Sequence, residues 1–417
     1  MKDLFFKMYT SLLCKIKTIL KRILYNWFGG YPRVMSDEIA AVSTVLRGPN
    51  WNMAYGKGLV HEKLENDFAE YVGSNYAIAV NTGGMALQMS MRGLGCALGD
   101  EVVTQIDTCS ATAFAIHNAG CTPIFSDISN ETFMLPETEF DSVIGGKTKA
   151  LIATHMWGNP ENIAKLRNTC ARNNLVLIED ACLALGARLP NGAAGSIGDV
   201  GVFSFGCLKP VQGGEGGMIV TNDEALAKEL RSMRHWGDRA IDFGIRDTTQ
   251  LSWNGRMSEI VAAVVREQLK GYPTHLAALR DAVSQFNNYI SKYEGIELVL
   301  GSSNSIADCA FAQIVLRMDR KYNVLDLRNK FSDLGISTWH ANFELINTLS
   351  FYKNKTYKKW IYSNDFDRID QNYVRDYPVA QSVFANYGIG IPKRYFLSTL
   401  KLRYLMHQFD KVMRTYN

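Results

Sequence analysis

The chain has 417 residues, of which 47% are hydrophobic and 21% charged, a balance typical of a globular protein with a sizeable core and more than one domain. Residues 1–28 contain six Lys and Arg and one Asp, which gives this segment a charge of +5. Because the net charge of the chain is +4, the remaining residues carry −1, and this balance does not indicate a nucleic-acid partner. The eight cysteines include no CxxC pair and the seven histidines form no metal-binding motif, so we expect reduced thiols, a cytoplasmic protein and no metal.

The first 30 residues have the pattern of a basic amphipathic helix. Apolar side chains recur at the helical period from Phe5 to Trp27, and lysines and one arginine lie mostly on the opposite face. The lysines interrupt any apolar run long enough to span a bilayer or to act as a signal peptide. Such a helix suits the inner face of an anionic membrane, so residues 1–28 are a candidate peripheral membrane contact. Packing on the body or on a partner subunit explains the pattern equally well.

From Tyr31 onward the pattern predicts alternating helices and strands. Helices over 36–47 and 61–72 come first. Strands follow over 76–80, 101–104, 123–125, 150–154 and 175–178, with helices over 85–94, 111–119 and 163–173 between them. Strands spaced by helices give a mainly parallel sheet, and its ligands bind at the carboxyl ends of the strands. We therefore predict an α/β fold whose large domain, residues 31–255, contains a mainly parallel mixed sheet flanked by helices.

The remainder, residues 256–417, predicts a connecting helix and a smaller C-terminal α/β domain. A long helix is expected over 251–271 and a second over 276–293, and short strands over 297–300 and 310–316 follow. The segment from Lys353 to Asn372 is rich in Lys, Tyr and Asp and has little periodicity, so we expect an exposed insertion there.

One lysine, Lys209, lies in a glycine-rich turn between the β-prone segments 202–205 and 218–221. Glycines let a backbone fold tightly or lie close to a ligand, because no Cβ obstructs it. A lysine enclosed there loses solvation, which favours the neutral, nucleophilic amine. Schiff-base chemistry with pyridoxal phosphate (PLP) requires such an amine. Taken alone, the same pattern also fits an ordinary surface lysine.

Other polar features lie where predicted strands meet turns. Thr82-Gly83-Gly84 is a turn between a predicted strand and a predicted helix, and the free amides at that helix start could bind a phosphate, although a turn without a ligand explains the glycines as well. Asp180 ends an apolar strand, where a buried acid needs a partner such as the pyridinium nitrogen of PLP; a helix cap or a metal ligand is equally compatible. Ser204 shares a turn with Lys209. Asn254 precedes the long helix and could cap it or reach a phosphate.

Together and in this order, these residues resemble the DegT, DnrJ, EryC and StrS family of PLP-dependent sugar aminotransferases, which have fold type I. The resemblance runs from about residue 32 to residue 222, continues through Asn254-Gly-Arg-Met, and weakens after about residue 300. Its further pieces are GDEVV (99–103), Thr108 with Ala111-Thr112, Asp127, His155-Met-Trp-Gly158, Glu179-Asp180-Ala181, the run from Gly198 to Phe205, Gly214-Glu-Gly-Gly217 and His235-Trp-Gly237.

The resemblance implies a role for each candidate residue in binding PLP. Lys209 would hold the cofactor covalently and then shuttle the proton of the reaction, and Asp180 would pair with the pyridine nitrogen. The backbone amides of Gly83 and Gly84 and the hydroxyl of Ser204 would hold the phosphate.

Family active sites are built across a homodimer, which implies that Asn254 reaches the phosphate from the neighbouring subunit.

Two positions depart from the family pattern: Leu183 stands where Gln or His is usual, and Cys109 stands where an aromatic residue is common. Because Lys209 and Asp180 are both present, we favour a divergent branch with a reshaped pocket over a loss of activity.

The leading hypothesis is an aminotransferase that moves an amino group, expected to come from glutamate, onto a keto-sugar. The family's usual acceptors are nucleotide-linked keto-sugars used for surface polysaccharides or glycoconjugates. A sugar dehydratase of the same family is a weaker alternative, because that chemistry is associated with replacement of the lysine, and Lys209 is present. A non-catalytic member docked on membranes by residues 1–28 is the third, supported only by Leu183 and Cys109.

Overall fold

The computed structural model describes residues 36–48, 59–207, 209–238, 247–248, 250–303, 305–340, 345–361, 363 and 365–416. The helix predicted over residues 1–30 lies outside these ranges. Within them, no helix is both long and apolar enough to cross a membrane.

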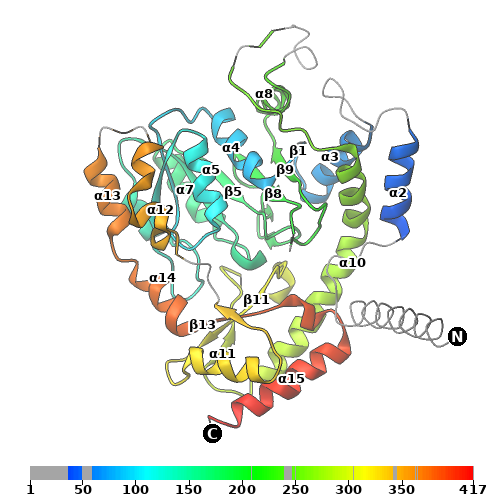
Figure 1. Cartoon of the computed structure of the whole chain (residues 1–417), viewed down its shortest axis with the longest axis vertical. Coiled ribbons are helices and arrows are strands. Elements are labelled where there is room, and N and C mark those ends of the chain that lie inside the picture. Colours follow the sequence, from blue (N-terminus) through cyan, green and yellow to red (C-terminus); the bar gives the residue numbers. More distant parts are fainter. Residues whose placement is uncertain are drawn as a thin grey trace, which may run out of the picture.

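A seven-stranded sheet forms the centre of the larger body (Figure 1). Its strand order is β1-β9-β8-β5-β4-β2-β3. The run from β8 to β3 is parallel throughout, whereas β9 is antiparallel to both of its neighbours. This mixed, mainly parallel sheet confirms the predicted fold class. The strands are β1 (Tyr76–Val80), β2 (Glu101–Gln105), β3 (Thr122–Ser126), β4 (Thr148–Thr154), β5 (Val176–Asp180), β8 (Val200–Ser204) and β9 (Gly217–Thr221).

Helices cover both faces of this sheet, because successive side chains of a strand point to opposite sides. On β4, Ala150 and Ile152 pack in a core with α4 and α5, while Leu151 and Ala153 pack in another with α6 and α7. Two short strands, β6 (Arg188–Leu189) and β7 (Gly192–Ala193), pair separately. The helices of this body are α2 (Ser36–Arg47), α3 (Leu59–Val72), α4 (Gly83–Gly93), α5 (Ser110–Asn118), α6 (Glu137–Val143), α7 (Ile163–Arg172) and α8 (Glu224–Arg234).

A single long helix, α10 (Glu259–Ile290), joins the larger body to the smaller one (Figure 1). The prediction of two helices, over 251–271 and 276–293, was therefore wrong. Pro273 lies inside α10 and cannot donate a backbone hydrogen bond, a loss that usually costs about 3 kcal/mol. The helix continues because Leu269, Tyr272 and Leu276 keep the helical period across the proline and are all buried against the core.

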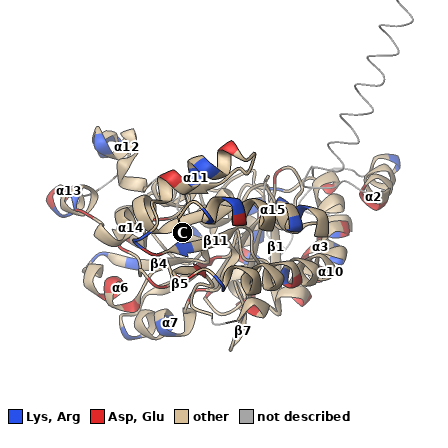
Figure 2. Ribbon diagram, turned by 90° about the horizontal axis from the view of Figure 1, so that it is seen from below, with Lys and Arg blue, Asp and Glu red and all other residues tan. Residues whose placement is uncertain are grey.

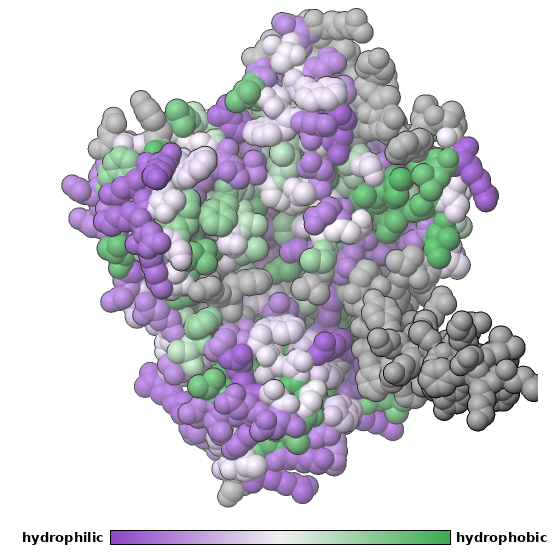
Figure 3. Space-filling model, in the orientation of Figure 1, coloured by the Kyte–Doolittle hydropathy of each residue, from purple (hydrophilic) through white to green (hydrophobic). Residues whose placement is uncertain are grey.

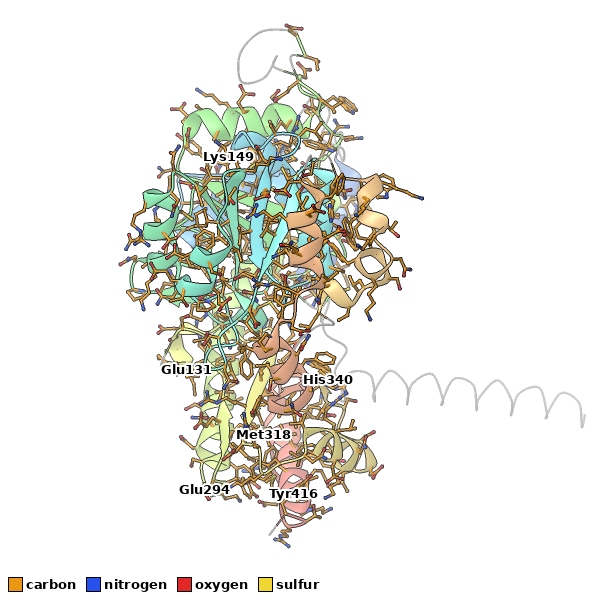
Figure 4. The ribbon with its side chains drawn as sticks, turned by 90° about the vertical axis from the view of Figure 1, so that its left-hand side faces the viewer. Glu131, Lys149, Glu294, Met318, His340 and Tyr416 are labelled. Carbon is orange, nitrogen blue, oxygen red and sulfur yellow. The ribbon has the colours of Figure 1, made fainter. Side chains whose placement is uncertain are left out.

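The smaller body contains a four-stranded antiparallel sheet of order β10-β11-β13-β12. Its elements are β10 (Ile296–Leu298), β11 (Ile314–Met318), α11 (Val324–Asp333), β12 (Trp339–His340), β13 (Gly388–Ile391) and α15 (Thr399–Met413). Figure 4 shows the two bodies one above the other, with Lys149 of β4 in the upper one and Met318, Glu294 and Tyr416 in the lower one.

The segment between β12 and β13 returns to the larger body instead of extending into solvent. It forms α12 (Ser350–Lys353), α13 (Phe366–Val374) and α14 (Pro378–Ser382), which lie along the flank of the large sheet (Figure 1). The side chain of Asn372 accepts a hydrogen bond from the Phe125 amide of β3 and donates one to the Phe125 carbonyl, at 2.9 and 2.8 Å. Tyr357 and Tyr373 are buried.

The prediction of an exposed insertion over 353–372 was therefore wrong. In the described part of this segment, lysines around α12 are exposed (Figure 2), whereas Tyr357, Ile361, Ile369 and Asn372 are buried. The tyrosines supply the buried side, and helices this short show too few turns for a clear period.

Candidate active site

Four of the predicted site residues converge at the carboxyl ends of β5 and β8. Asp180 is the last residue of β5, Ser204 is the last residue of β8, and Gly83 begins α4. Lys209 lies in the turn that connects β8 to the antiparallel β9. Parallel α/β sheets bind their ligands at this edge.

The carboxylate of Asp180 is buried and held in one orientation. Its Oδ2 accepts a hydrogen bond of 2.9 Å from the Thr112 hydroxyl, and its Oδ1 accepts one of 3.2 Å from the Cys182 amide. The Thr108 hydroxyl lies 3.5 Å from the Thr112 hydroxyl and 3.3 Å from the Thr154 hydroxyl, so a chain of hydroxyls leads to the acid through Thr112. A buried carboxylate fixed in this way is suited to pair with a cationic group of a ligand.

The neighbouring acid, Glu179, holds the end of β5 in place. It is fully buried and accepts hydrogen bonds from His155 Nε2 and from the backbone amides of Gly195, Ile197 and Gly198. Burial opposes its charge, but these hydrogen bonds outweigh burial and lower the pKa of Glu179. Within the described residues no group of three or more acidic, histidine or cysteine side chains could hold a metal ion.

The start of α4 forms a narrow anion cradle. Thr82 caps the helix by accepting a hydrogen bond from the Met85 amide, whereas the amides of Gly83 and Gly84 donate to no acceptor among the described residues. A Cβ on Gly83 would lie only 2.8 Å from the Cβ of Ser204. This close approach places the Ser204 hydroxyl beside the free amides, an arrangement that fits a phosphate group.

The Lys209 turn is held from both bodies of the molecule. The Lys209 carbonyl accepts a hydrogen bond of 2.9 Å from the Gln212 side-chain amide and one of 3.5 Å from Lys393 Nζ. Gln212 is in turn held by Gln268 of α10. Sequence reasoning missed Lys393, because it lies far from Lys209 along the chain and no local motif marks it.

Cys182 shows how closely the acid and the amine approach each other. Burial raises the pKa of the Cys182 thiol well above its ordinary value. The carboxylate of Asp180 raises it further, the ammonium of Lys209 opposes the rise, and Cys109 adds a smaller increase. The thiol of Cys182 is thus affected by both the carboxylate of Asp180 and the amine of Lys209, which indicates that both groups lie near it.

The two departures from the family pattern lie in different settings. Cys109, the residue before α5, is exposed. Leu183 is partly buried, and its carbonyl lies 2.7 Å from the position that a Cβ on Gly158 would take.

Asn254 lies in the segment between α8 and α10. It is exposed, pairs through its backbone with His235, and its carbonyl lies 3.5 Å from the Asn81 side-chain amide. Trp236 beside it is 53% exposed and stacks on Arg256, with 3.9 Å between the guanidinium carbon and the ring centre. This surface faces away from the chain's own core.

A primary amine, a buried carboxylate and a phosphate-sized anion cradle are the protein groups that PLP needs. The family model described as the DegT/DnrJ/EryC1/StrS aminotransferase family matches residues 32–368. The chain belongs to the DegT/DnrJ/EryC1/StrS aminotransferase family. This membership confirms the predicted family, the predicted PLP-dependent aminotransferase and the predicted cofactor.

Curated members of this family resemble the chain over much of its length. The GDP-perosamine synthase of Escherichia coli O157:H7 is 30% identical over 302 residues, which cover 72% of this chain and 81% of that protein. The GDP-perosamine synthase of Caulobacter vibrioides is 34% identical over 58% of this chain and 64% of its own length, so this chain spans somewhat less than two thirds of that relative. A dTDP-3-amino-3,4,6-trideoxy-alpha-D-glucose transaminase of Micromonospora megalomicea is 27% identical over 318 residues, which cover 75% of this chain and 83% of that protein.

Solved structures have the same fold. The aminotransferase from Psychrobacter cryohalolentis superimposes with a TM-score of 0.82 at 25% identity, covering 93% of this chain and 99% of that one. A Streptococcus pneumoniae protein solved in its PLP form superimposes with a TM-score of 0.79 at 21% identity. The superposition covers 93% of this chain and 98% of that one.

Proposed function

We propose that this aminotransferase moves the amino group of glutamate onto a nucleotide-linked keto-sugar for polysaccharide or glycoconjugate synthesis. The convergence of Lys209, Asp180 and the start of α4 at one sheet edge carries the proposal, because these groups suit PLP chemistry. The curated relatives support the substrate class, since their names specify GDP- and dTDP-linked amino sugars.

Each candidate residue then has one task. Bound PLP acts as an electron sink, which lets the amino-bearing carbon of a substrate lose a proton. Nζ of Lys209 holds the cofactor, and once released it accepts and returns that proton. Asp180, oriented by Thr112, keeps the ring nitrogen protonated. The amides of Gly83 and Gly84 and the hydroxyl of Ser204 hold the phosphate.

A direct test combines cofactor trapping with product analysis. Purified protein should show PLP absorbance, and borohydride treatment followed by peptide mapping should place the pyridoxyl group on Lys209. Incubation with glutamate and a panel of GDP- and dTDP-linked keto-sugars should then yield an amino sugar, detected by mass, and Lys209→Ala should abolish it. A deoxygenated product would indicate a dehydratase instead, and unaltered turnover in Lys209→Ala would indicate that Lys209 is not the catalytic amine.

We also propose that the active unit is a homodimer in which Asn254 reaches the phosphate of the neighbouring subunit. The exposed position of Asn254 supports this, as does a patch of exposed apolar side chains over α2 and the start of α3 (Figure 3). Ile39, Leu46 and Leu59 are 60, 55 and 74% exposed there.

Subunit mixing tests the shared site. Asn254→Ala and Lys209→Ala proteins should each be inactive or nearly so. If the two residues act from different subunits, mixed dimers contain one intact site, and activity should recover to about a quarter of the wild-type value. No recovery after verified subunit exchange would place Asn254 in the site of its own chain.

For residues 1–28 the proposal is a peripheral contact with the inner face of the membrane, supported by the sequence pattern alone. Full-length protein should co-sediment with anionic liposomes more than a 1–28 deletion does, and salt should weaken binding. Equal binding by both proteins would dispose of this contact.

A further inference from the structure

Lys393 brings a second ammonium group from the smaller body to the Lys209 turn. It follows β13 and Pro392, and it begins a short 3₁₀-helix, Lys393–Phe396. Its Nζ donates a hydrogen bond of 3.5 Å to the Lys209 carbonyl, the same atom that the Gln212 side chain contacts. The Lys393 ammonium is therefore anchored on the backbone of the catalytic lysine.

The ammonium of Lys393 lies where burial and a neighbouring positive charge disfavour its protonated form. Burial, and then the charge of Lys209, lower the pKa of Lys393 to about 7. The adjacent cation differs: Arg394 is exposed and donates a hydrogen bond of 2.8 Å to the Ser337 hydroxyl. When Lys209 is bonded to the cofactor, the Lys393 ammonium still lies beside the Lys209 turn, and it attracts an anion that enters there.

We infer that Lys393 determines substrate specificity by binding an anionic oxygen group of a substrate beside Lys209, in the first place the carboxylate of the amino donor. This inference rests on the proposed function. In an amino acid the carboxylate is attached to the carbon that loses its proton to Lys209, so it must lie close to that lysine. The diphosphate of a nucleotide sugar is the second source of such a group, but the sugar ring separates it from the keto carbon.

The same residue helps to explain how one site accepts two unlike substrates. The donor presents a carboxylate at this place, whereas the acceptor presents an uncharged ring. An ammonium close to its pKa can keep its proton against the carboxylate and lose it at small cost when the sugar ring replaces the donor. A permanently charged guanidinium lacks this freedom.

The experiment compares Lys393→Met, Lys393→Arg and the control Arg394→Met, which removes a neighbouring exposed cation. Calorimetry measures the affinity of each holoenzyme for glutarate, a dicarboxylate without a reactive amine, and for GDP. Rapid mixing with glutamate separates the apparent dissociation constant from the maximal rate of the donor half-reaction.

Lys393→Met should weaken glutarate and glutamate binding about 10- to 100-fold, because a charged hydrogen bond is lost. Lys393→Arg should retain glutarate affinity within a few-fold, and Arg394→Met should match the wild type.

The outcomes separate this inference from the proposed function. Loss of GDP affinity with unchanged glutarate affinity would assign Lys393 to the diphosphate. Affinities within twofold of wild type for both probes, or no binding of either probe by the wild type, would overturn the inference. A uniform loss of PLP content and thermal stability in Lys393→Met, with normal binding in the part that holds PLP, would show a structural role and also overturn it. If the wild type transaminates nothing but binds glutarate through Lys393, the proposed reaction fails while the inference stands.

Discussion

The hydroxyl of Thr112, on α5, donates a hydrogen bond of 2.9 Å to Oδ2 of Asp180, at the end of β5. Both side chains are buried, so no solvent replaces this contact when it is removed. Thr112→Val, which keeps the shape and removes the donor, should therefore weaken PLP binding about 10- to 100-fold, as measured by absorbance after dialysis.

Thr108→Val is the matched control for this change. Its hydroxyl contacts the hydroxyls of Thr112 and Thr154 and not Asp180, so we expect only a small loss of affinity. If Thr112→Val held PLP as tightly as the wild type, the hydroxyl would not be orienting the acid.

The cradle at the start of α4 predicts opposite results for two adjacent glycines. A Cβ on Gly83 would lie 2.8 Å from the Ser204 Cβ, whereas a Cβ on Gly84 would meet only Thr82 Oγ1, at 4.0 Å. Gly83→Ala should therefore displace the Ser204 hydroxyl and reduce PLP affinity at least tenfold, while Gly84→Ala keeps its backbone amide and should bind nearly normally. Equal behaviour of the two variants in a PLP titration would contradict this geometry.

The positions of these residues at strand ends could be predicted because they depend on local features. A Gly-Gly turn after a strand, and an acid that ends an apolar strand, are visible within a few residues. Asp180 does end β5, whereas α4 begins at Gly83, two residues before the predicted start. The order of strands in the sheet was not visible in this way. Neither was the pairing of Thr112 with Asp180, because the two residues lie far apart along the chain and meet only when α5 packs beside β5.

At the edge of the large sheet, the side chain of Asn372 makes the two hydrogen bonds that a neighbouring strand would make with Phe125. Its side chain pairs with both the amide and the carbonyl of Phe125 on β3, and it is only 9% exposed. Asn372→Ala leaves two backbone groups without these partners and should reduce the free energy of unfolding by about 2–4 kcal/mol, measured by urea denaturation. Gln371→Ala, at an exposed neighbouring position, should cost less than about 0.5 kcal/mol. A similar cost for both variants would rule out this bridging role.

The pKa of Lys393 predicts a pH-dependent difference in stability. The pKa is about 7 in the folded protein, against an ordinary value of 10.5, so between these values the unfolded chain binds more protons. The stability contributed by this residue therefore rises with pH from about 7 to 10.5. Without PLP, Lys393→Met should melt about 2 °C or more above the wild type at pH 6.5, and the gap should narrow by pH 9.5. A gap that stays constant across this range would show that the ammonium is well solvated.

Long-range contacts explain the main failures of sequence reasoning. Lys393 carries no motif of its own, and only the packing of the smaller body on the Lys209 turn gives it a role. The tyrosines and lysines around α12 and α13 read as a polar insertion because their apolar partners lie on β3, far away in the sequence. Pro273 indicates a helix break locally, and only the buried surface on both sides of it keeps α10 continuous.

The return of residues 350–382 to the flank of β3 means that the chain cannot be divided by a single cut. A fragment that ends at residue 255 would lose Asn372 and the tyrosines around it, and would leave the outer edge of β3 uncovered. An uncovered strand edge offers its amides and carbonyls to any other extended chain and promotes aggregation. The C-terminal third of this polypeptide therefore covers a strand edge that would otherwise be open to pairing with other chains.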